Sequence, residues 1–139
     1  MSINQDSELV RRAMAALEFA YTPYSNFAVG AAVQTSTGEI YSGCNIEVSS
    51  YGLTICAERV ALFKALSEGV REFTWIVVAA RTETFCPPCG ACRQVLTDFA
   101  PDIKVTLVNV HGKTKETTIT KLLPEAFNQS FLAELRTPK

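Results

Sequence analysis

The sequence predicts an α/β protein, a three-layer α/β/α sandwich around a mixed sheet of roughly five strands. The leading observation is a pair of apolar runs, at residues 75–80 and 104–110, of the kind found in strands covered on both faces. A helical pattern at residues 90–100 separates them, and this order implies a right-handed crossover with helices packed on the sheet. A chain of 139 residues is long enough for one layered core and too short for two, so residues 1–139 are expected to form a single domain.

The amino-terminal part predicts one helix and two strands. Apolar residues recur at helical spacing through residues 6–21, and Pro23 ends that helix. Residues 27–35 and 39–47 are predicted to be strands, because they flank the short polar turn of residues 36–38, which contains a glycine. We expect these two strands to form a hairpin.

Two more helices are predicted further along the chain. Thr54 is the expected N-cap of a helix over residues 55–68, which Gly69 ends. The apolar residues of this helix point in nearly every direction, as expected for a helix covered by both its sheet and a neighbour. Pro101 stops the helix that begins at Gly90. The remaining expected elements are a strand over residues 113–119, a break in the pattern at residues 122–127 and a short helix beyond Asn128.

Composition and charge exclude several classes of protein. The 13 Lys and Arg residues against 14 Asp and Glu residues give a net charge of −1 without a basic run, so nucleic acid is not an expected partner. No apolar run approaches the roughly 20 residues that span a bilayer, and the segment Met1–Asp6 lacks the pattern of a secretion signal. Five cysteines without such a signal indicate the reducing cytoplasm, where thiols bind metal or act in catalysis and disulfides are not expected. The hydrophobic fraction of 47% is high for a small monomer and favours subunit contacts.

Three cysteines stand out by their spacing. Cys56 begins the segment Cys-Ala-Glu-Arg, and Cys89 and Cys92 lie in Pro-Cys-Gly-Ala-Cys. Structural zinc is normally closed by four protein ligands, whereas catalytic zinc keeps three and leaves one position for water or substrate. Three thiolates therefore predict a catalytic zinc ion. The alternative is a closed structural site in which His111 is the fourth ligand.

The other cysteines and the histidine are expected to lie outside the metal site. The segment Cys86–Cys89 reads Cys-Pro-Pro-Cys, and at the rise of a polyproline helix its two sulfur-bearing residues would lie about 9 Å apart. Thiolates on one tetrahedral zinc ion lie only about 4 Å apart, so Cys86 is not an expected ligand. Cys44 is expected to face the core as a small buried hydrophobe, and His111 to be a solvated turn residue.

Four ordered segments resemble one known family. They are Tyr24–Ala31, Gly43–Glu47 with Tyr51, Cys56–Arg59 and Pro88–Val95. On these segments the chain resembles the small, homotetrameric, zinc-dependent cytidine deaminases, and the resemblance extends from Tyr24 to Phe127. It implies the cytidine deaminase-like fold and one zinc ion per chain on Cys56, Cys89 and Cys92. It also implies hydrolytic deamination of cytidine and 2′-deoxycytidine to uridine and 2′-deoxyuridine plus ammonia, a reaction of pyrimidine salvage.

Glu58 is the expected catalytic residue. Cys56 and Glu58 lie two residues apart and would diverge by about 200° in a regular helix, so they can serve one site only beyond the helix end. The resemblance implies that Glu58 takes a proton from the attacking water, delivers it to pyrimidine N3 and later protonates the departing amine. Arg59 shares the helical face of Cys56 and can donate a hydrogen bond to its sulfur. Gln94 is likewise expected beside the ligands.

Substrate contacts follow from strand geometry and from the resemblance. Asn45 and Glu47 lie two apart on a predicted strand, so both project from one face, where an amide and a carboxylate suit two sugar hydroxyls. In the resembled family these positions bind ribose, Phe27 resembles the aromatic residue that packs on the pyrimidine, and Ala57 is a further substrate contact. Because Glu47 would repel a 5′-phosphate, nucleosides are expected over nucleotides.

The resemblance also implies shared active sites. Tyr51 and Phe127 resemble residues that reach the pocket of an adjoining subunit, as in a homotetramer. One departure is Pro87, which stands where family members commonly carry a small hydroxyl residue, so any hydrogen bond from that side chain is lost. Two alternatives stay open: a deaminase of another aminated nucleoside or heterocycle, such as a nucleoside antibiotic, and a non-catalytic interaction module stapled by zinc.

Overall fold

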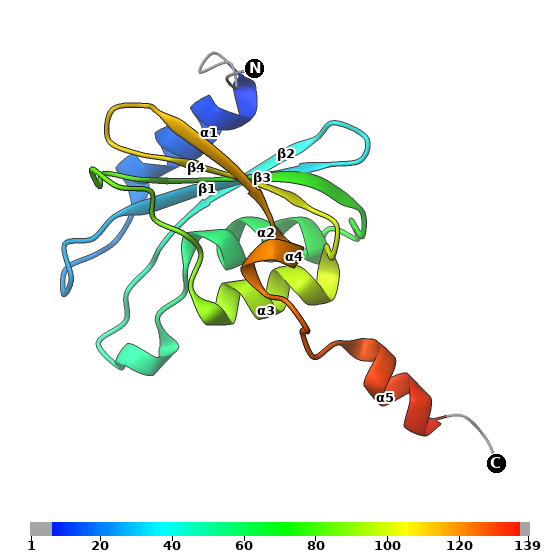
Figure 1. Ribbon diagram of the computed structural model, residues 1–139. Helices are drawn as coiled ribbons and strands as arrows, with labels where there is room; N and C mark the ends of the chain where they lie inside the picture. Colours follow the sequence, from blue (N-terminus) through cyan, green and yellow to red (C-terminus); the bar gives the residue numbers. More distant parts are fainter. Residues whose placement is uncertain (1–6, 137–139) are drawn as a thin grey trace.

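The computed structural model describes residues 7–136 and has a five-stranded mixed sheet at its centre (Figure 1). In chain order the strands are β1 (Val29–Thr35), β2 (Ile40–Cys44), β3 (Phe73–Ala80), β4 (Lys104–Val108) and β5 (Thr114–Thr118). Their order in the sheet is β2-β1-β3-β4-β5. β3 and β4 run parallel, and the other neighbouring pairs are antiparallel. The expected mixed sheet is confirmed, and so is the hairpin of β1 and β2.

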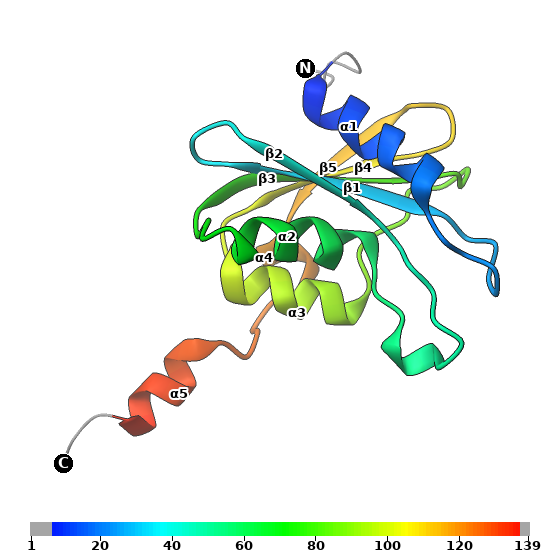
Figure 2. The same ribbon diagram turned by 180° about the vertical axis from the view of Figure 1, so that it is seen from behind.

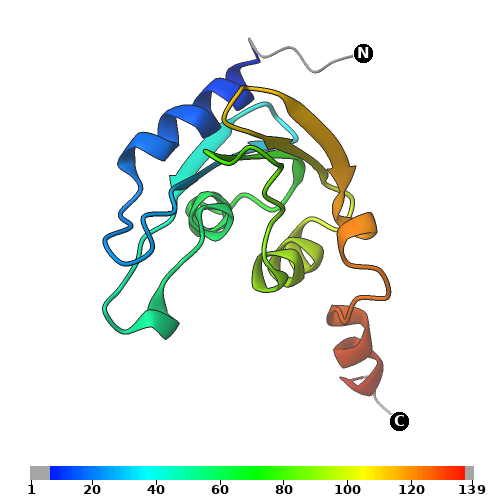
Figure 3. The same ribbon diagram turned by 60° about the vertical axis from the view of Figure 1, so that its left-hand side comes forward.

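Helices cover both faces of this sheet. The α-helices of residues 7–136 are α1 (Glu8–Ala16), α2 (Ala57–Ser67), α3 (Gly90–Phe99), α4 (Ile119–Leu122) and α5 (Gln129–Arg136), and the first three cover the faces of the sheet. α1 lies on one face, whereas α2 and α3 lie side by side on the other (Figures 1 and 2). The expected three-layer α/β/α sandwich is therefore confirmed. α5 lies apart from both helical layers, as Figure 3 shows, and has no buried residue. Within residues 7–136, no helix combines the length and the apolarity that a membrane span requires.

Alternation along the strands divides the core between the two helical layers. Ile76 and Val78 of β3 pack with α2 and α3, whereas Val77 and Ala79 pack with α1. Successive side chains of a strand point to opposite faces of the sheet. A strand that is apolar on both faces therefore needs a helix layer on each, which is what the continuous apolar run predicted.

Two glycines let helices approach the sheet closely. A Cβ atom at Gly30 would lie 2.1 Å from the backbone oxygen of Ala13 in α1. A Cβ atom at Gly43 would lie 2.6 Å from the backbone nitrogen of Ala61 in α2. Both distances are shorter than van der Waals contact, and the atoms met belong to backbone, so the helix itself would have to move.

We expect Gly30→Ala to lower the free energy of unfolding by about 2 kcal/mol, since overpacking a filled core costs about 1–3 kcal/mol. Gly52→Ala is the matched control, because a Cβ atom there meets no atom within 4 Å. Chemical denaturation of both variants measures the difference. Equal stability of the two variants would contradict the close packing of α1 on β1.

The start of the second helix differs from the prediction. α2 begins at Ala57 with Cys56 as its N-cap, so the prediction of Thr54 as N-cap was wrong. The Thr54 hydroxyl accepts a hydrogen bond from the Val48 amide at 3.1 Å. Ile55 is still extended, because its backbone pairs with the segment that follows β2. The shift places Cys56 at the helix end.

Two other elements are shorter than predicted. The helix expected over residues 6–21 ends as α1 at Ala16, followed by a 3₁₀ turn over Leu17–Phe19; its expected start at Asp6 lies outside the described residues. The strand expected over residues 39–47 ends at Cys44. Both differences have one cause: the segments after α1 and after β2 pair with each other, since Tyr21 exchanges backbone hydrogen bonds with Asn45 and Glu47. The bounds of β1, β3, β4, β5 and α3 lie within two residues of the predicted ones.

Candidate active site

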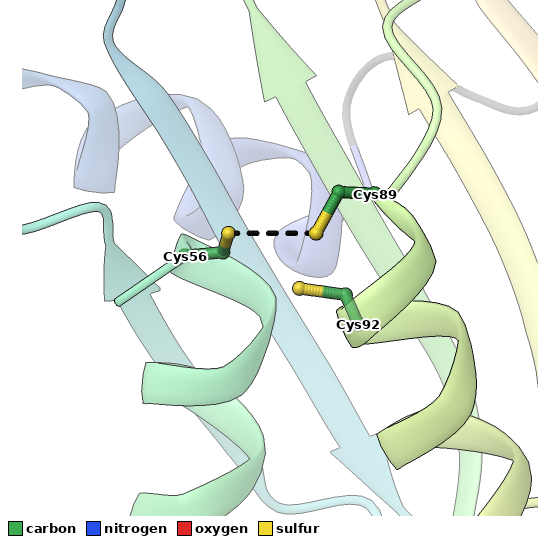
Figure 4. Close-up of side chains that lie close together, drawn as sticks. All are labelled: Cys56, Cys89 and Cys92. Atoms are coloured by element: carbon green, nitrogen blue, oxygen red, sulfur yellow. Dashed lines mark hydrogen bonds between the residues drawn. The ribbon is translucent and has the colours of Figure 1, made fainter. Parts of the chain in front are cut away.

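Three cysteine side chains converge between the amino-terminal ends of α2 and α3 (Figure 4). Cys56 is the N-cap of α2, Cys89 is the N-cap of α3, and Cys92 lies in the first turn of α3. Their Sγ atoms all lie within 4.8 Å of one another, and those of Cys56 and Cys89 are 3.7 Å apart. The prediction that these three thiols meet is confirmed.

The thiol cluster fits a zinc ion. Zinc–sulfur bonds of about 2.3 Å in a tetrahedral site place two sulfurs about 3.8 Å apart, close to the spacing of Cys56 and Cys89. In the part of the chain that the structure describes, no fourth His, Cys, Asp or Glu atom joins the three sulfurs. A four-coordinate zinc ion held by them has one position left for a small molecule, as in catalytic zinc sites.

The other candidate ligands lie elsewhere. His111 is exposed in the turn after β4, and its Nε2 lies 2.7 Å from the carboxylate of Glu83, so it does not close the site. Cys86 stays outside the cluster, as predicted. Cys44 is half-buried in a groove lined by α1, β2 and α2, so the prediction that it is buried in the core was wrong. The reason is that β2 is an edge strand of the sheet.

Positive charge acts on the sulfurs from three sources. Arg59 Nη2 donates a hydrogen bond to Cys56 Sγ at 3.3 Å, as its spacing predicted. Hydrogen bonds from the Cys92 thiol and from Arg59 lower the pKa of Cys56 to about 5, while the same contact with Cys56 raises the pKa of Cys92. The amino-terminal ends of α2 and α3 add partial positive charge. Cys56 is therefore held as a thiolate, the form that binds zinc.

Glu58 lies in the first turn of α2 and is 4% exposed. Burial raises its pKa to about 7, and the charge of Cys56 acts in the same direction, whereas the hydrogen bond from its own backbone amide acts against both. A carboxyl group with this pKa can both accept and donate a proton near neutral pH. Glu58 and Cys56 line one cavity, so the site lies beyond the helix end, as their spacing requires.

This cavity has a volume of about 330 Å³, within the range of small-molecule sites. Five of the predicted substrate and catalytic residues line it together: Phe27, Asn45, Glu47, Ala57 and Glu58. Cys56 and Cys89 form its wall on the side of the thiol cluster. The structure therefore brings metal-binding, acid–base and polar recognition groups to one space, although they come from four separate segments of the chain.

Asn45 and Glu47 also hold the loop that carries Phe27. Asn45 Oδ1 accepts a hydrogen bond from the Val29 amide at 2.9 Å, and its Nδ2 donates to the Phe27 carbonyl at 2.7 Å. The carboxylate of Glu47 accepts hydrogen bonds from the backbone amides of residues 24 and 25 and from the hydroxyl of Ser25. The two residues thus face the cavity and fix part of its wall.

The predicted site residues Tyr51, Phe127 and Gln94 do not line this cavity. Tyr51 is 71% exposed and makes an edge contact with the ring of Tyr24, and Phe127 is 58% exposed and stacks on Phe131. Gln94 was expected beside the ligands, but its Nε2 donates to the Phe127 carbonyl at 2.8 Å. Gln94 lies two residues beyond Cys92, so its side chain leaves α3 in a direction about 200° around the helix axis from that of Cys92.

Several residues of the cavity wall were not assigned from the sequence. They are Ser25, Val29, Val78, Cys86 and Pro87. Ser25 lies in the segment Tyr24–Ala31, which carries part of the family resemblance. This position was the one sequence feature that could have placed Ser25 in the cavity wall. Cys86 was considered as a ligand only, although the segment that precedes Cys89 had to pass close to the metal.

Comparison with known proteins agrees with this geometry. A sequence model described as the cytidine and deoxycytidylate deaminase zinc-binding region matches residues 3–108. The chain belongs to this family. Among curated relatives, a cytidine deaminase from Halalkalibacterium halodurans is 53% identical over 120 residues, which cover 86% of this chain and 91% of the relative.

Other members of the deaminase family are also similar. A crystal structure of cytidine deaminase from Burkholderia pseudomallei matches with a TM-score of 0.83 at 50% identity, covering 86% of this chain and 96% of that one. A blasticidin-S deaminase from Bacillus cereus is 37% identical over 134 residues, which cover 91% of this chain and 94% of the relative. Similarity is therefore higher to the two cytidine deaminases than to the enzyme named for an antibiotic.

Proposed function

We propose that the chain is a zinc-dependent cytidine deaminase that converts cytidine and 2′-deoxycytidine to uridine and 2′-deoxyuridine with release of ammonia. The observation that carries the proposal is the meeting of three thiols and the buried Glu58 at one cavity. Hydrolytic deamination needs a metal that activates water and a carboxyl group that moves protons. Family membership and the identity to cytidine deaminases support the same reaction.

In this proposal each group has one role. Cys56, Cys89 and Cys92 hold the zinc ion, which supplies the Lewis acidity that activates water near neutral pH. Glu58 accepts one proton from the attacking water and transfers it to N3 of the pyrimidine. It then takes the second proton from the hydroxyl group added at C4 and delivers it to the amine, so that ammonia leaves as the C4 carbonyl forms. Oxygen thus replaces nitrogen at C4, and Glu58 returns to its starting state.

Recognition of a nucleoside is assigned to the polar end of the cavity. Asn45 and Glu47 are proposed to hydrogen-bond the sugar hydroxyls, while Phe27 packs on the base and Ala57 lines its edge. A hydrogen bond from the Ser25 hydroxyl is the main cause that lowers the pKa of Glu47, so this carboxylate is ionised at neutral pH. Its charge disfavours a 5′-phosphate, and cytidine should be used in preference to cytidine monophosphate.

The deciding experiment is an assay of the purified protein with cytidine, 2′-deoxycytidine, cytosine and cytidine monophosphate. Loss of cytidine absorbance and release of ammonia should occur with both nucleosides, and removal of zinc should abolish both signals. A zinc-containing protein that releases no ammonia from either nucleoside would contradict the proposal.

A second candidate function is deamination of a nucleoside antibiotic, which the similarity to the Bacillus cereus blasticidin-S deaminase favours. Adding blasticidin S to the same assay separates the two candidates by the ratio of their kcat/KM values. We expect cytidine to be preferred, because identity is higher to the cytidine deaminases. The non-catalytic zinc module predicts four protein ligands, and residues 7–136 bring three together.

We further propose that the protein is a homotetramer with shared active sites. In a single chain Phe27 is 44% exposed, and Tyr51 and Phe127 do not line the cavity and have most of their surface in solvent. Such exposure of large aromatic side chains is typical of surfaces that a partner covers. A neighbouring subunit that brings Tyr51 and Phe127 to the cavity would cover it.

Co-expression of Phe127→Ala and Glu58→Gln chains tests this arrangement. Each homo-oligomer should be impaired, but mixed oligomers should recover up to about a quarter of wild-type activity, because about a quarter of their sites combine an intact Glu58 with an intact Phe127. Light scattering should give four times the chain mass of 15.2 kDa. No recovery in mixed oligomers would contradict site sharing through Phe127.

The cellular compartment of the reaction is proposed from the redox state of the cysteines. All five cysteines are free thiols, and thiolate ligands persist in a reducing compartment, so we assign the protein to the cytoplasm. There the reaction returns cytosine nucleosides to the uridine pool, which is pyrimidine salvage. We also assign residues 1–139 to a single domain, because the described elements share one sheet.

A further inference from the structure

Ser25 lies in the cavity wall and connects two of the residues proposed to contact the nucleoside. Its hydroxyl donates a hydrogen bond to the Glu47 carboxylate and accepts one from the Phe27 amide at 3.0 Å. Its own amide donates to the other oxygen of Glu47 at 3.1 Å. One exposed serine is therefore hydrogen-bonded both to the Glu47 carboxylate and to the backbone amide of Phe27.

The contact with Ser25 fixes the Glu47 carboxylate and still leaves it able to accept a further hydrogen bond. Glu47 Oε1 accepts from the amides of Tyr24 and Ser25, and Oε2 accepts from the Ser25 hydroxyl. Each carboxylate oxygen can accept two hydrogen bonds, so Oε2 can still accept one from a sugar hydroxyl. The hydrogen bond from the Ser25 hydroxyl thus helps to fix the position of Glu47 Oε2.

On the side of Phe27, hydrogen bonds replace packing. The ring is 44% exposed, so the core does not hold it in place. The backbone of this residue is held at its amide by Ser25 and at its carbonyl by Asn45. Loss of the hydroxyl would free the amide and leave the position of the ring less defined.

We propose that Ser25 is a positioning residue for the nucleoside, which aligns the carboxylate of Glu47 with the sugar and the ring of Phe27 with the base. The inference rests on the proposed function and extends it to a residue of the cavity wall that does no chemistry itself. Ser25 sets the discrimination between sugars that carry hydroxyl groups and sugars that lack them.

The test compares kcat/KM for cytidine with kcat/KM for 2′,3′-dideoxycytidine, which lacks the two sugar hydroxyls assigned to Asn45 and Glu47. Ser25→Ala should raise KM for cytidine about tenfold with a smaller change in kcat, as expected for loss of a hydrogen bond to a charged group. In this variant kcat/KM should decrease less for the dideoxynucleoside than for cytidine, so the ratio of kcat/KM for cytidine to that for the dideoxynucleoside should fall. Ser25→Thr keeps the hydroxyl and should restore the ratio.

Two further variants separate positioning from a general loss of structure. Ser67→Ala removes a hydroxyl that donates to the Lys64 carbonyl near the far end of α2, and it should leave the ratio unchanged. In a Glu47→Gln background, Ser25→Ala should change the ratio no further, since the two residues act through one contact. A ratio that Ser25→Ala leaves at the wild-type value, in an enzyme that deaminates cytidine, would overturn the inference alone. A wild-type protein inactive on cytidine would overturn the proposed function and the inference with it.

Discussion

Glu58→Gln should leave zinc bound and the fold intact but lower kcat for cytidine by at least about a thousandfold, because a positioned proton-transfer group contributes about 10²–10⁴-fold and Glu58 serves two transfers. Glutamine has nearly the shape of glutamate, so the side chain, which is 4% exposed, can be replaced without a cavity. An amide neither takes a proton from water nor gives one to a leaving amine. Steady-state kinetics and zinc content, measured on the same preparation, check both parts.

The matched control for this variant is Glu68→Gln. Glu68 is the exposed C-cap of the same helix, α2, at the end away from the cysteines. Its substitution removes the same charge from the chain and should leave kcat within about twofold of wild type, as is usual for surface positions. Near-normal turnover in a zinc-loaded Glu58→Gln protein would show that another group moves the proton.

Cys89→Ser should lower zinc affinity by more than about a hundredfold, since loss of an outer partner of a ligand alone costs about 10–100-fold. Deaminase activity should fall with the zinc content. The thermal midpoint should fall as well, because Cys56 and Cys89 begin two different helices and the ion joins those helix ends. Metal analysis after dialysis against a chelator, together with thermal unfolding, measures both effects.

Cys86→Ser and Cys44→Ser are the matched controls for metal binding. Cys86 is three residues from Cys89 and lines the same cavity, but its sulfur lies outside the thiol cluster. Cys44 lies in a separate groove beside α1. Both variants should therefore retain one zinc ion per chain. Loss of zinc from Cys86→Ser with retention in Cys89→Ser would mean that the ligand set is wrong.

Those parts of the fold that depend on local pattern could be predicted from the sequence. β3 and β4 were found because an apolar run on both faces of a strand has few alternatives. The strand expected over residues 39–47 and the N-cap expected at Thr54 failed for the opposite reason. The segments around Tyr21, Ile46 and Ile55 pair with one another in extended form, and neither periodicity nor capping preference reports a pairing between distant segments.

The candidate site divides in the same way. The thiol cluster and Glu58 could be predicted although Cys56 and Cys89 lie 33 residues apart, because the motifs that contain them carry the resemblance to zinc-dependent deaminases. The role of Ser25 was missed, because the resemblance gave that position no role and its contact with Glu47 joins residues that lie 22 positions apart. Gln94 was expected beside the ligands, but it donates to the Phe127 carbonyl although α3 begins where predicted, because side chains two residues apart on a helix diverge by about 200°.

X-ray absorption at the zinc edge of the purified full-length protein tests the central claim most directly. Three sulfur neighbours at about 2.3 Å and one oxygen neighbour at about 2.0 Å are expected, because the three cysteines that would hold the ion leave one position of a tetrahedral site for water. Four sulfur neighbours, or three sulfurs with an imidazole nitrogen, would contradict the claim. A zinc ion closed by four protein ligands has no position at which water can be activated.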